Sequence, residues 1–178
     1  MLKISAVIPT RGDVDMRPIV AHLKGFPEIT EVLVLTGDTV FNRYRAAKMA
    51  ENEIIYTQDD DCITDIRPII DAYEPGIIVN AMTPQHAERY PRRQTLIGFG
   101  AIFDRWLIDV LKEWEDEPLF LSKCDRIFTT LNQHKTVFPK IESLPCATAK
   151  NRLYRQPGYY LEVASINARI FERTGIIA

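Results

Sequence analysis

Strand-like and helix-like segments alternate along the first half of the chain. Short apolar runs rich in β-branched residues predict buried strands at residues 3–9, 31–36, 53–57 and 76–80. Apolar residues spaced three or four apart predict helices between them, with faces made by Met16, Ile19, Val20 and Leu23, by residues 42–50, and by Ile66, Ile69, Ile70 and Tyr73. Because parallel strands need long crossovers, usually helical, this order predicts an α/β fold with a mostly parallel central sheet flanked by helices.

The second half of the chain carries two amphipathic patterns and two polar stretches. From Ile102 a helical face is predicted, made by Phe103, Trp106, Leu107, Val110, Leu111 and Trp114. A shorter helix carries Cys124, Ile127, Phe128 and Leu131. Residues 83–93 lack an apolar period and indicate a polar loop. Residues 144–160 are interpreted as a mobile tail segment of a single domain that spans residues 1–178.

Composition excludes several classes of protein. A chain of 178 residues with 46% hydrophobic content buries one core and is short for two. The 22 Lys and Arg against 24 Asp and Glu give a net charge of -2, so no overall field attracts nucleic acid or membrane. Cys62, Cys124 and Cys146 lack the CxxC spacing of zinc or redox sites. No run approaches the roughly 20 apolar residues of a membrane span, so we expect a soluble, cytoplasmic protein.

An acidic turn follows one of the predicted strands. Asp59, Asp60 and Asp61 come directly after residues 53–57, at the carboxyl end of a strand, where open α/β sheets bind ligands. Carboxylates about 5 Å apart repel by roughly 3 kcal/mol per pair at an effective dielectric near 20, and a cation relieves this repulsion. Oxygen donors suit Mg²⁺ or Mn²⁺, with substrate phosphates completing the shell. The turn therefore predicts a metal-bound nucleoside diphosphate, and the alternative is a solvated acidic loop.

The order of the motifs resembles that of a known family. A first strand ending in Pro-Thr-Arg, a helix bearing Asn-Arg, a strand running into QDDDC, the segment GFGAIFDRW and then KCDRIFTTLN follow one another as in GT-A glycosyltransferases. Within this family the chain is most similar to the exostosin-like group, whose acidic motif is also a triple Asp. The similarity covers residues 3–131, and the later part matches poorly. The resemblance implies a GT-A fold and transfer of a sugar from a nucleotide-diphosphate donor, a UDP-sugar, to an acceptor hydroxyl.

The resemblance also implies roles for individual residues. Asp61 is implied as a direct ligand of Mn²⁺ or Mg²⁺, and Asp59 or Asp60 as a contact to the ribose or to the metal shell, with Asp59 the second candidate metal ligand. Further contacts to the nucleotide-sugar are implied for Thr10, Arg11, Asn42, Arg45 and Gly100. Arg152 corresponds to a late arginine near the departing diphosphate. From the residues alone, surface turns and a solvated basic face explain these positions equally well.

Asp125 is the predicted catalytic carboxylate. We place it at the start of the shorter late helix, where it would face a cleft beside the acceptor. In an inverting enzyme it would deprotonate the acceptor hydroxyl. In a retaining enzyme, toward which the exostosin-like resemblance leans, it would stabilise the positively charged transition state or bind the acceptor. The alternative is that Asp125 only caps the helix.

Two basic clusters are candidate contacts to a polyanion. One contains Arg89, Arg92 and Arg93 in the polar loop, and the other is the basic tail with Lys150, Arg152 and Arg155. They would bind the donor's diphosphate or a nucleic-acid acceptor such as DNA with hydroxymethylated bases, and glycan or lipid-linked acceptors are equally open. His134 is not assigned to the metal, because a lone histidine near a helix end is more typical of a dipole partner.

Two other functions would use the same features. Nucleotidyl transfer also uses strand-end carboxylates and Mg²⁺, but a Gly-rich, basic loop after the first strand is typical of it, and PTRGDVD carries only part of such a loop. A non-catalytic nucleotide- or metal-binding module would keep the acidic turn and leave Asp125 as a cap.

Overall fold

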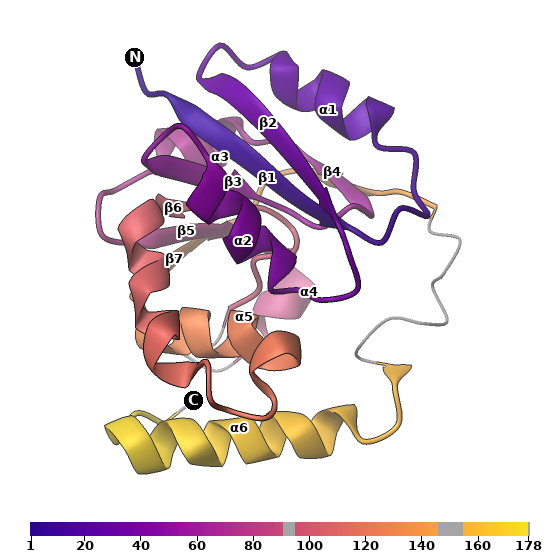
Figure 1. Cartoon of the computed structure of the whole chain (residues 1–178). Helices are drawn as coiled ribbons and strands as arrows, with labels where there is room; N and C mark the ends of the chain where they lie inside the picture. Colours follow the sequence, from indigo (N-terminus) through magenta and orange to yellow (C-terminus); the bar gives the residue numbers. More distant parts are fainter. Residues whose placement is uncertain (91–94, 146–154, 178) are drawn as a thin grey trace.

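The computed structural model describes residues 1–90, 95–145 and 155–177, and within this part of the chain six strands form one sheet in the order β2-β1-β3-β6-β5-β7 (Figure 1). The strands are β1 (Ile4–Thr10), β2 (Ile29–Thr36), β3 (Ile54–Thr57), β5 (Ile78–Ala81), β6 (Ala101–Asp104) and β7 (His134–Val137). A small second sheet pairs β4 (Cys62–Thr64) antiparallel with β8 (Ile141–Ser143).

The central sheet is mostly parallel, which confirms the prediction. β1 pairs parallel with β2 and with β3, and β5 pairs parallel with β7. β6 is antiparallel to both of its neighbours, β3 and β5. Apart from β6, the strands therefore point in one direction, and their carboxyl ends meet at one edge of the sheet. This is the edge at which open α/β sheets bind ligands.

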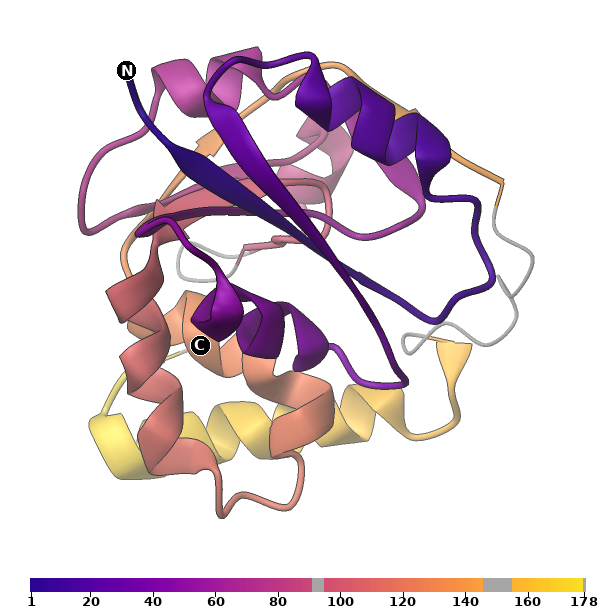
Figure 2. The same cartoon turned by 45° about the horizontal axis from the view of Figure 1, so that its top comes forward.

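Helices cover both faces of the sheet (Figure 2). One face carries α1 (Arg17–Lys24) and α3 (Arg67–Asp71), and the other carries α2 (Asn42–Met49), the 3-10 helix η1 (Arg105–Trp114) and α5 (Phe120–Leu131). The two cores follow from the alternation of strand side chains, since Val7 and Ile55 face α2 whereas Ala6 and Tyr56 face α1. A short helix, α4 (Pro84–Ala87), lies in the predicted polar loop.

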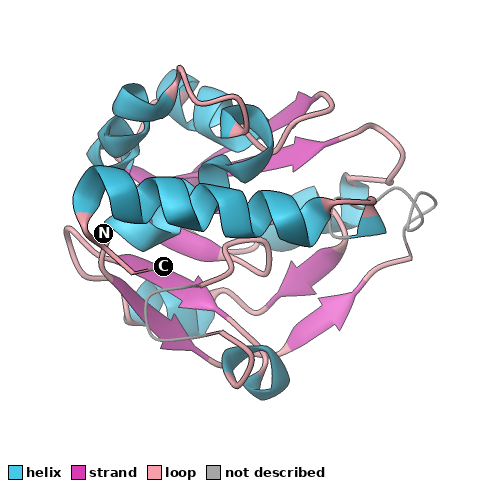
Figure 3. Ribbon diagram, turned by 90° about the horizontal axis from the view of Figure 1, so that it is seen from below, coloured by secondary structure: helices cyan, strands magenta, loops and turns pink. Residues whose placement is uncertain are grey.

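A helix that the sequence analysis does not predict forms the outermost layer. α6 (Tyr159–Thr174) packs on the far side of α5 (Figure 1; Figure 3). Ile166 and Ile170, one turn apart, are fully buried in the core that α2 and α5 share. Of the predicted tail, residues 146–154 lie outside the described residues, and Tyr159 already belongs to α6. No helix among the described residues is long and apolar enough to cross a membrane.

One predicted helix boundary is wrong. Ile102 and Phe103 belong to β6 rather than to a helix, and η1 begins only at Arg105. Both residues are fully buried because β6 lies in the middle of the sheet, with helices on both faces. A short apolar run of this kind does not distinguish a central strand from a helix. A short strand that the sequence does not predict, β4, lies between the acidic turn and α3.

Candidate active site

The acidic turn lies between β3 and β4, at the carboxyl edge of the sheet. Asp59, Asp60 and Asp61 are all half-buried. The backbone N–H of Asp59 donates to the carbonyl of Gly98 at 2.7 Å, and the backbone N–H of Leu144 donates to the carbonyl of Asp61, also at 2.7 Å. The turn is therefore fixed at both ends, with its carboxylates near the surface.

Gly98 makes room for the first carboxylate of the turn. A Cβ atom on Gly98 would lie 2.3 Å from Oδ2 and 2.9 Å from Cγ of Asp59. Any side chain at this position would push the Asp59 carboxylate away. A glycine at position 98 is therefore explained by the Asp59 side chain packed against it.

A buried arginine joins the acidic turn to α5. Arg43, on α2, is 1% exposed, and its Nη2 lies 2.6 Å from Oδ1 of Asp59. Its Nη1 donates to Oγ1 of Thr57 at 3.3 Å. Its Nε lies 3.2 Å from Oδ1 of Asp125, an ion pair without hydrogen-bond geometry. One guanidinium therefore holds carboxylates from two separate parts of the chain.

Arg43 belongs to the Asn-Arg motif of the sequence, but its burial and its ion pairs were not predicted, although a signal for them exists. Arg43 precedes Ala46, Ala47 and Ala50 at spacings of three, four and seven, and all three alanines are buried. Arg45 lies on the exposed side of the same helix. An arginine on the apolar face of a helix costs free energy unless it finds an anionic partner, so this position points to a buried ion pair.

Asp125 lies in the second turn of α5, not at its start. The helix begins at Phe120, so the expected position and the N-cap alternative are both wrong. The hydroxyl of Tyr44 donates to Oδ1 of Asp125 at 2.8 Å, and the Asp125 side chain is 29% exposed. Burial raises the pKa of Asp125, and the charge of Arg43 opposes this shift. Asp125 is therefore a more basic carboxylate than an exposed aspartate, and it keeps some access to solvent.

The two partners of Asp125 keep their protons. Burial lowers the pKa of Arg43, but the charges of Asp125 and Asp59 outweigh burial and raise it above its usual value. Burial and the Asp125 charge raise the pKa of Tyr44 well above its usual value. Near neutral pH the network thus contains a charged guanidinium and a neutral phenol that donates to Asp125.

Two of the predicted donor-binding residues are buried, one at the carboxyl end of β1 and the other at the start of α2. Thr10 is 4% exposed, and its Oγ1 accepts a hydrogen bond from the Gly12 N–H at 3.0 Å. The carbonyl of Thr10 accepts from the Gly37 N–H at 2.9 Å. A Cβ on Gly37 would lie 2.2 Å from Nδ2 of Asn42, which is itself 4% exposed. These residues tie together the loops beside the acidic turn.

The predicted basic contacts are exposed where the structure describes them. Arg11 and Arg89 are exposed, and Arg45 is exposed with its guanidinium 5.4 Å from the ring centroid of Phe41. Of the basic loop and tail, Arg155 is exposed as well. Arg92, Arg93, Lys150 and Arg152 lie outside the described residues. The roles given to all of these arginines stay predictions.

His134 begins β7 and does not lie on a helix, which corrects its predicted place. Burial lowers the pKa of His134. The helix-dipole role suggested by the sequence therefore does not apply to this residue.

Gly100 is required by its backbone conformation and by its neighbours. Its φ is +124°, and a Cβ atom would lie 2.7 Å from the Tyr56 hydroxyl and 3.2 Å from Cδ1 of Ile69. We expect Gly100→Ala to lower the free energy of unfolding by about 2–3 kcal/mol, from backbone strain and overpacking together. Gly158→Ala is the matched control, because Gly158 has a φ of +82° but no atom within 4 Å of its Cβ position. Equal losses in urea unfolding of the two variants would contradict the packing argument.

The donor atoms of the acidic turn fit a hard divalent cation. Among the described residues, no group of three or more His, Cys, Asp or Glu side chains is arranged to hold a metal ion. Mg²⁺ and Mn²⁺ do not need such a group, because one or two carboxylates and substrate phosphates complete their shell. Asp61 and Asp59 remain the predicted ligands, with one oxygen of Asp59 already engaged by Arg43.

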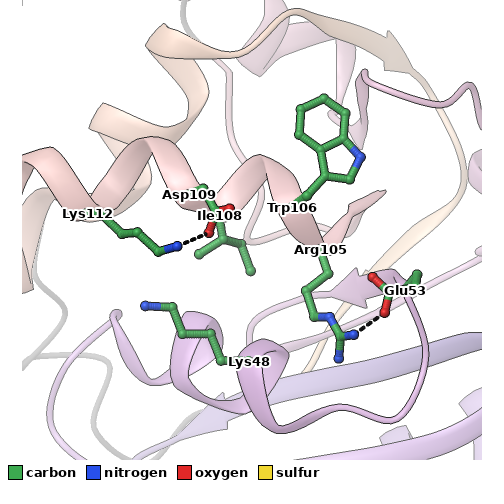
Figure 4. A pocket seen from close by; sticks show the side chains of 7 residues that line it. All are labelled: Lys48, Glu53, Arg105, Trp106, Ile108, Asp109 and Lys112. Atoms are coloured by element: carbon green, nitrogen blue, oxygen red, sulfur yellow. Dashed lines mark hydrogen bonds and ion pairs between the residues drawn. The ribbon is translucent and has the colours of Figure 1, made fainter.

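A depression of about 400 Å³ lies at the opposite edge of the sheet (Figure 4). Its lining includes Glu53, just before β3, and Arg105, just after β6. Figure 4 shows Arg105 turned toward Glu53, and Lys112 toward Asp109 with 2.9 Å between the charged atoms. These four charges form two ion pairs, and the depression lies away from the acidic turn. For both reasons we do not assign the active site here.

Comparison with known proteins relates the chain to others by structure alone. No protein-family model and no curated protein sequence matches it. A protein from Bacillus anthracis described as a glucose-1-phosphate thymidylyltransferase superposes with a TM-score of 0.54 and 11% identity, covering 86% of this chain and 96% of its own. A197 from STIV gives 0.51 and 16%, covering 81% and 86%. The glycosyltransferase GlyE of Streptococcus pneumoniae gives 0.49 and 13%, covering 98% and 52%.

These likenesses establish the fold. The arrangement of strands and helices is shared with A197 and with the B. anthracis protein described as a thymidylyltransferase. The exostosin-like relationship is not among these findings and stays a prediction. The chain has the α/β fold of the nucleotide-diphospho-sugar transferases.

Proposed function

We propose that the chain is a metal-dependent glycosyltransferase that moves a sugar from a nucleotide-diphosphate donor, a UDP-sugar, to an acceptor hydroxyl. One observation carries this proposal. Asp59 of the acidic turn and Asp125 of α5 both contact the guanidinium of Arg43, at 2.6 Å and 3.2 Å, at the ligand-binding edge of an α/β sheet. The guanidinium of Arg43 therefore lies between the carboxylate proposed to bind the donor and the carboxylate proposed as the base.

The acidic turn would hold the donor. Asp61 and Asp59 are the proposed ligands of Mn²⁺ or Mg²⁺, and the ion would supply Lewis-acid neutralisation of the departing diphosphate. Asp60 would contact the ribose. Thr10, buried at the end of β1, and Asn42, buried at the start of α2, would fix the loops that contact the nucleotide. Arg43 would keep the Asp59 carboxylate in one orientation, so the donor site would be preorganised.

Asp125 would act on the acceptor. In an inverting reaction its carboxylate accepts the proton of the acceptor hydroxyl, the acceptor oxygen bonds to the anomeric carbon, and the bond from that carbon to the diphosphate breaks with its electron pair. Its raised pKa makes it a better proton acceptor. The Tyr44 hydroxyl and Arg43 both contact Oδ1, which fixes the orientation of the carboxylate. In a retaining reaction the same carboxylate would stabilise the positive charge on the sugar.

The loop after β1 supports glycosyl over nucleotidyl transfer. A nucleotidyltransferase typically holds a triphosphate with a Gly-rich, basic loop at this place. Here the segment between β1 and α1 contains one glycine, Gly12, and one arginine, Arg11. Nucleotidyl transfer remains the alternative outcome of the experiment below, since the B. anthracis neighbour shares the fold.

Thermal unfolding with nucleotides tests the proposal. At a hundredfold excess of UDP over its Kd in Mn²⁺, we expect the Tm to rise by about 5–10 °C. Without Mn²⁺ the rise should be small, because the turn's carboxylates then repel the diphosphate. Asp61→Asn should lose the metal-dependent part, whereas Asp116→Asn, at an 82% exposed side chain away from the turn, should keep it.

Two outcomes would contradict glycosyl transfer from UDP. A metal-dependent rise with a nucleoside triphosphate but with no diphosphate, together with pyrophosphate release when a sugar phosphate is added, would establish nucleotidyl transfer. A panel of nucleotides with no metal-dependent rise at all would leave the acidic turn as a solvated loop.

A further inference from the structure

α5 carries three charged side chains close together, and two of them have charged partners among the described residues. Asp125 is paired with Arg43. The Lys123 side chain is 3% exposed, and its Nζ lies 2.6 Å from Oε2 of Glu162 on α6. In the described part of the chain, Arg126 forms no ion pair, and its electrostatic neighbours are Tyr90 and Tyr159. Within the described ranges, Arg126 is thus the charged side chain of this helix that has no charged partner.

The surroundings of Arg126 exclude much of the solvent. Arg126, Tyr90 and Tyr159 are all half-buried, and they come from α5, from the segment after α4 and from the first turn of α6. Burial lowers the pKa of Arg126, which reflects the cost of removing water from a cation. A group with negative charge would offset this cost, and each tyrosine hydroxyl is able to donate a further hydrogen bond.

This cluster adjoins the predicted base. The phenol of Tyr159 interacts electrostatically with Arg126, with Tyr90 and with the Asp125 carboxylate. Lys123 lies over the ring of Tyr159, 4.5 Å from its centroid, and helps to fix it. An anion bound by Arg126 would therefore lie close to Asp125, on the side of α5 that faces α6 rather than β3.

We propose that Arg126, Tyr90 and Tyr159 form an anion-binding subsite for the acceptor, which holds a phosphate or carboxylate group while an acceptor hydroxyl faces Asp125. The assignment of this subsite to the acceptor rests on the proposed function, whereas the anion site itself does not. Its ligand class is an anionic sugar, either a phosphorylated sugar or a uronic acid.

Binding measurements with simple probes test the subsite. Glucose 6-phosphate and glucuronate represent the two sources of negative charge, and glucose is the neutral control. By calorimetry we expect at least one of the anionic sugars to bind the wild-type protein, and Arg126→Gln to weaken it by at least about tenfold. Arg169→Gln, at a 56% exposed arginine of α6, should leave its Kd unchanged.

A second variant keeps the test decisive if Arg126→Gln does not fold. Tyr159→Phe removes one hydroxyl and leaves the charge, and it should weaken the same anion about threefold to tenfold. Unchanged binding in the folded variants, or no binding of either anion to the wild-type protein, would overturn the subsite.

The UDP and Mn²⁺ thermal shift, measured on the same variants, separates this inference from the proposed function. If Arg126→Gln reduces that shift as strongly as it reduces sugar binding, Arg126 belongs to the donor site and the acceptor assignment is wrong. If UDP gives no shift but the anion still depends on Arg126, the subsite stands and glycosyl transfer from UDP fails.

Discussion

Replacement of Arg43 by Met is expected to lower the free energy of unfolding by about 3–5 kcal/mol, since removing one partner of a buried ion pair leaves uncompensated charge. Arg43 is fully enclosed and holds Asp59 and Asp125 together. Without it, two carboxylates face each other across the space it filled. Urea unfolding at neutral pH measures the loss. The same variant should also lose the metal-dependent UDP shift, because Asp59 is no longer oriented.

The matched control is Arg45→Met, two residues along the same helix. Arg45 is exposed, so the change in unfolding free energy should stay within about 0.5 kcal/mol. A similar loss in both variants would show that the helix, not the buried pair, is sensitive to substitution. If the Arg45 variant keeps its stability but binds UDP more weakly, its predicted contact to the nucleotide gains support.

The stability deficit of Arg43→Met should depend on pH in a definite direction. The folded-state pKa of Asp125 is already raised by burial, and loss of the Arg43 charge raises it further. An acid whose folded-state pKa is raised stabilises the fold at low pH, and this contribution is lost as the pH rises through the folded-state value. The deficit should therefore be smallest in acid and grow toward neutral pH, and the opposite trend in urea unfolding would refute this account.

Asp125→Asn is expected to lower kcat by about a hundredfold to ten-thousandfold, the range for loss of a general base. UDP release from a panel of UDP-sugars measures the rate. The asparagine amide cannot accept the proton. Because it is nearly the same size as the aspartate carboxylate, it should keep the neighbouring packing contacts. The wild-type rate should fall as the pH decreases through the raised pKa of Asp125.

Two measurements distinguish a catalytic from a merely structural Asp125. The UDP and Mn²⁺ thermal shift should be retained in Asp125→Asn, because Asp59 and its contact to Arg43 remain. Tyr44→Phe should keep most of the activity, since it removes only the hydrogen bond to Oδ1. A full rate in the Asp125 variant, or an equal loss in both, would assign Asp125 to the packing of α5 and not to the reaction.

Apart from β4, the order of strands and helices from β1 to β5 follows from local sequence. Period and turn residues indicate β1, α1, β2, α2, β3 and β5 to within a few residues, because each segment carries its own hydrophobic pattern. The acidic turn was also predictable, since its position depends only on where β3 ends. A fully buried segment is different. β6 has apolar side chains on both faces, so its pattern does not distinguish a strand from a helix.

The local pattern of residues determined that this chain forms a mostly parallel α/β sheet with carboxylates at the end of β3. Only the tertiary structure decided which charges meet there. Arg43, Asp59 and Asp125 lie far apart in sequence, and their contacts depend on the strand order and on which side of α2 and α5 faces the sheet. Such contacts are set by the packing of whole elements, so a short stretch of sequence can indicate that Arg43 is buried but cannot identify the carboxylates that pair with it.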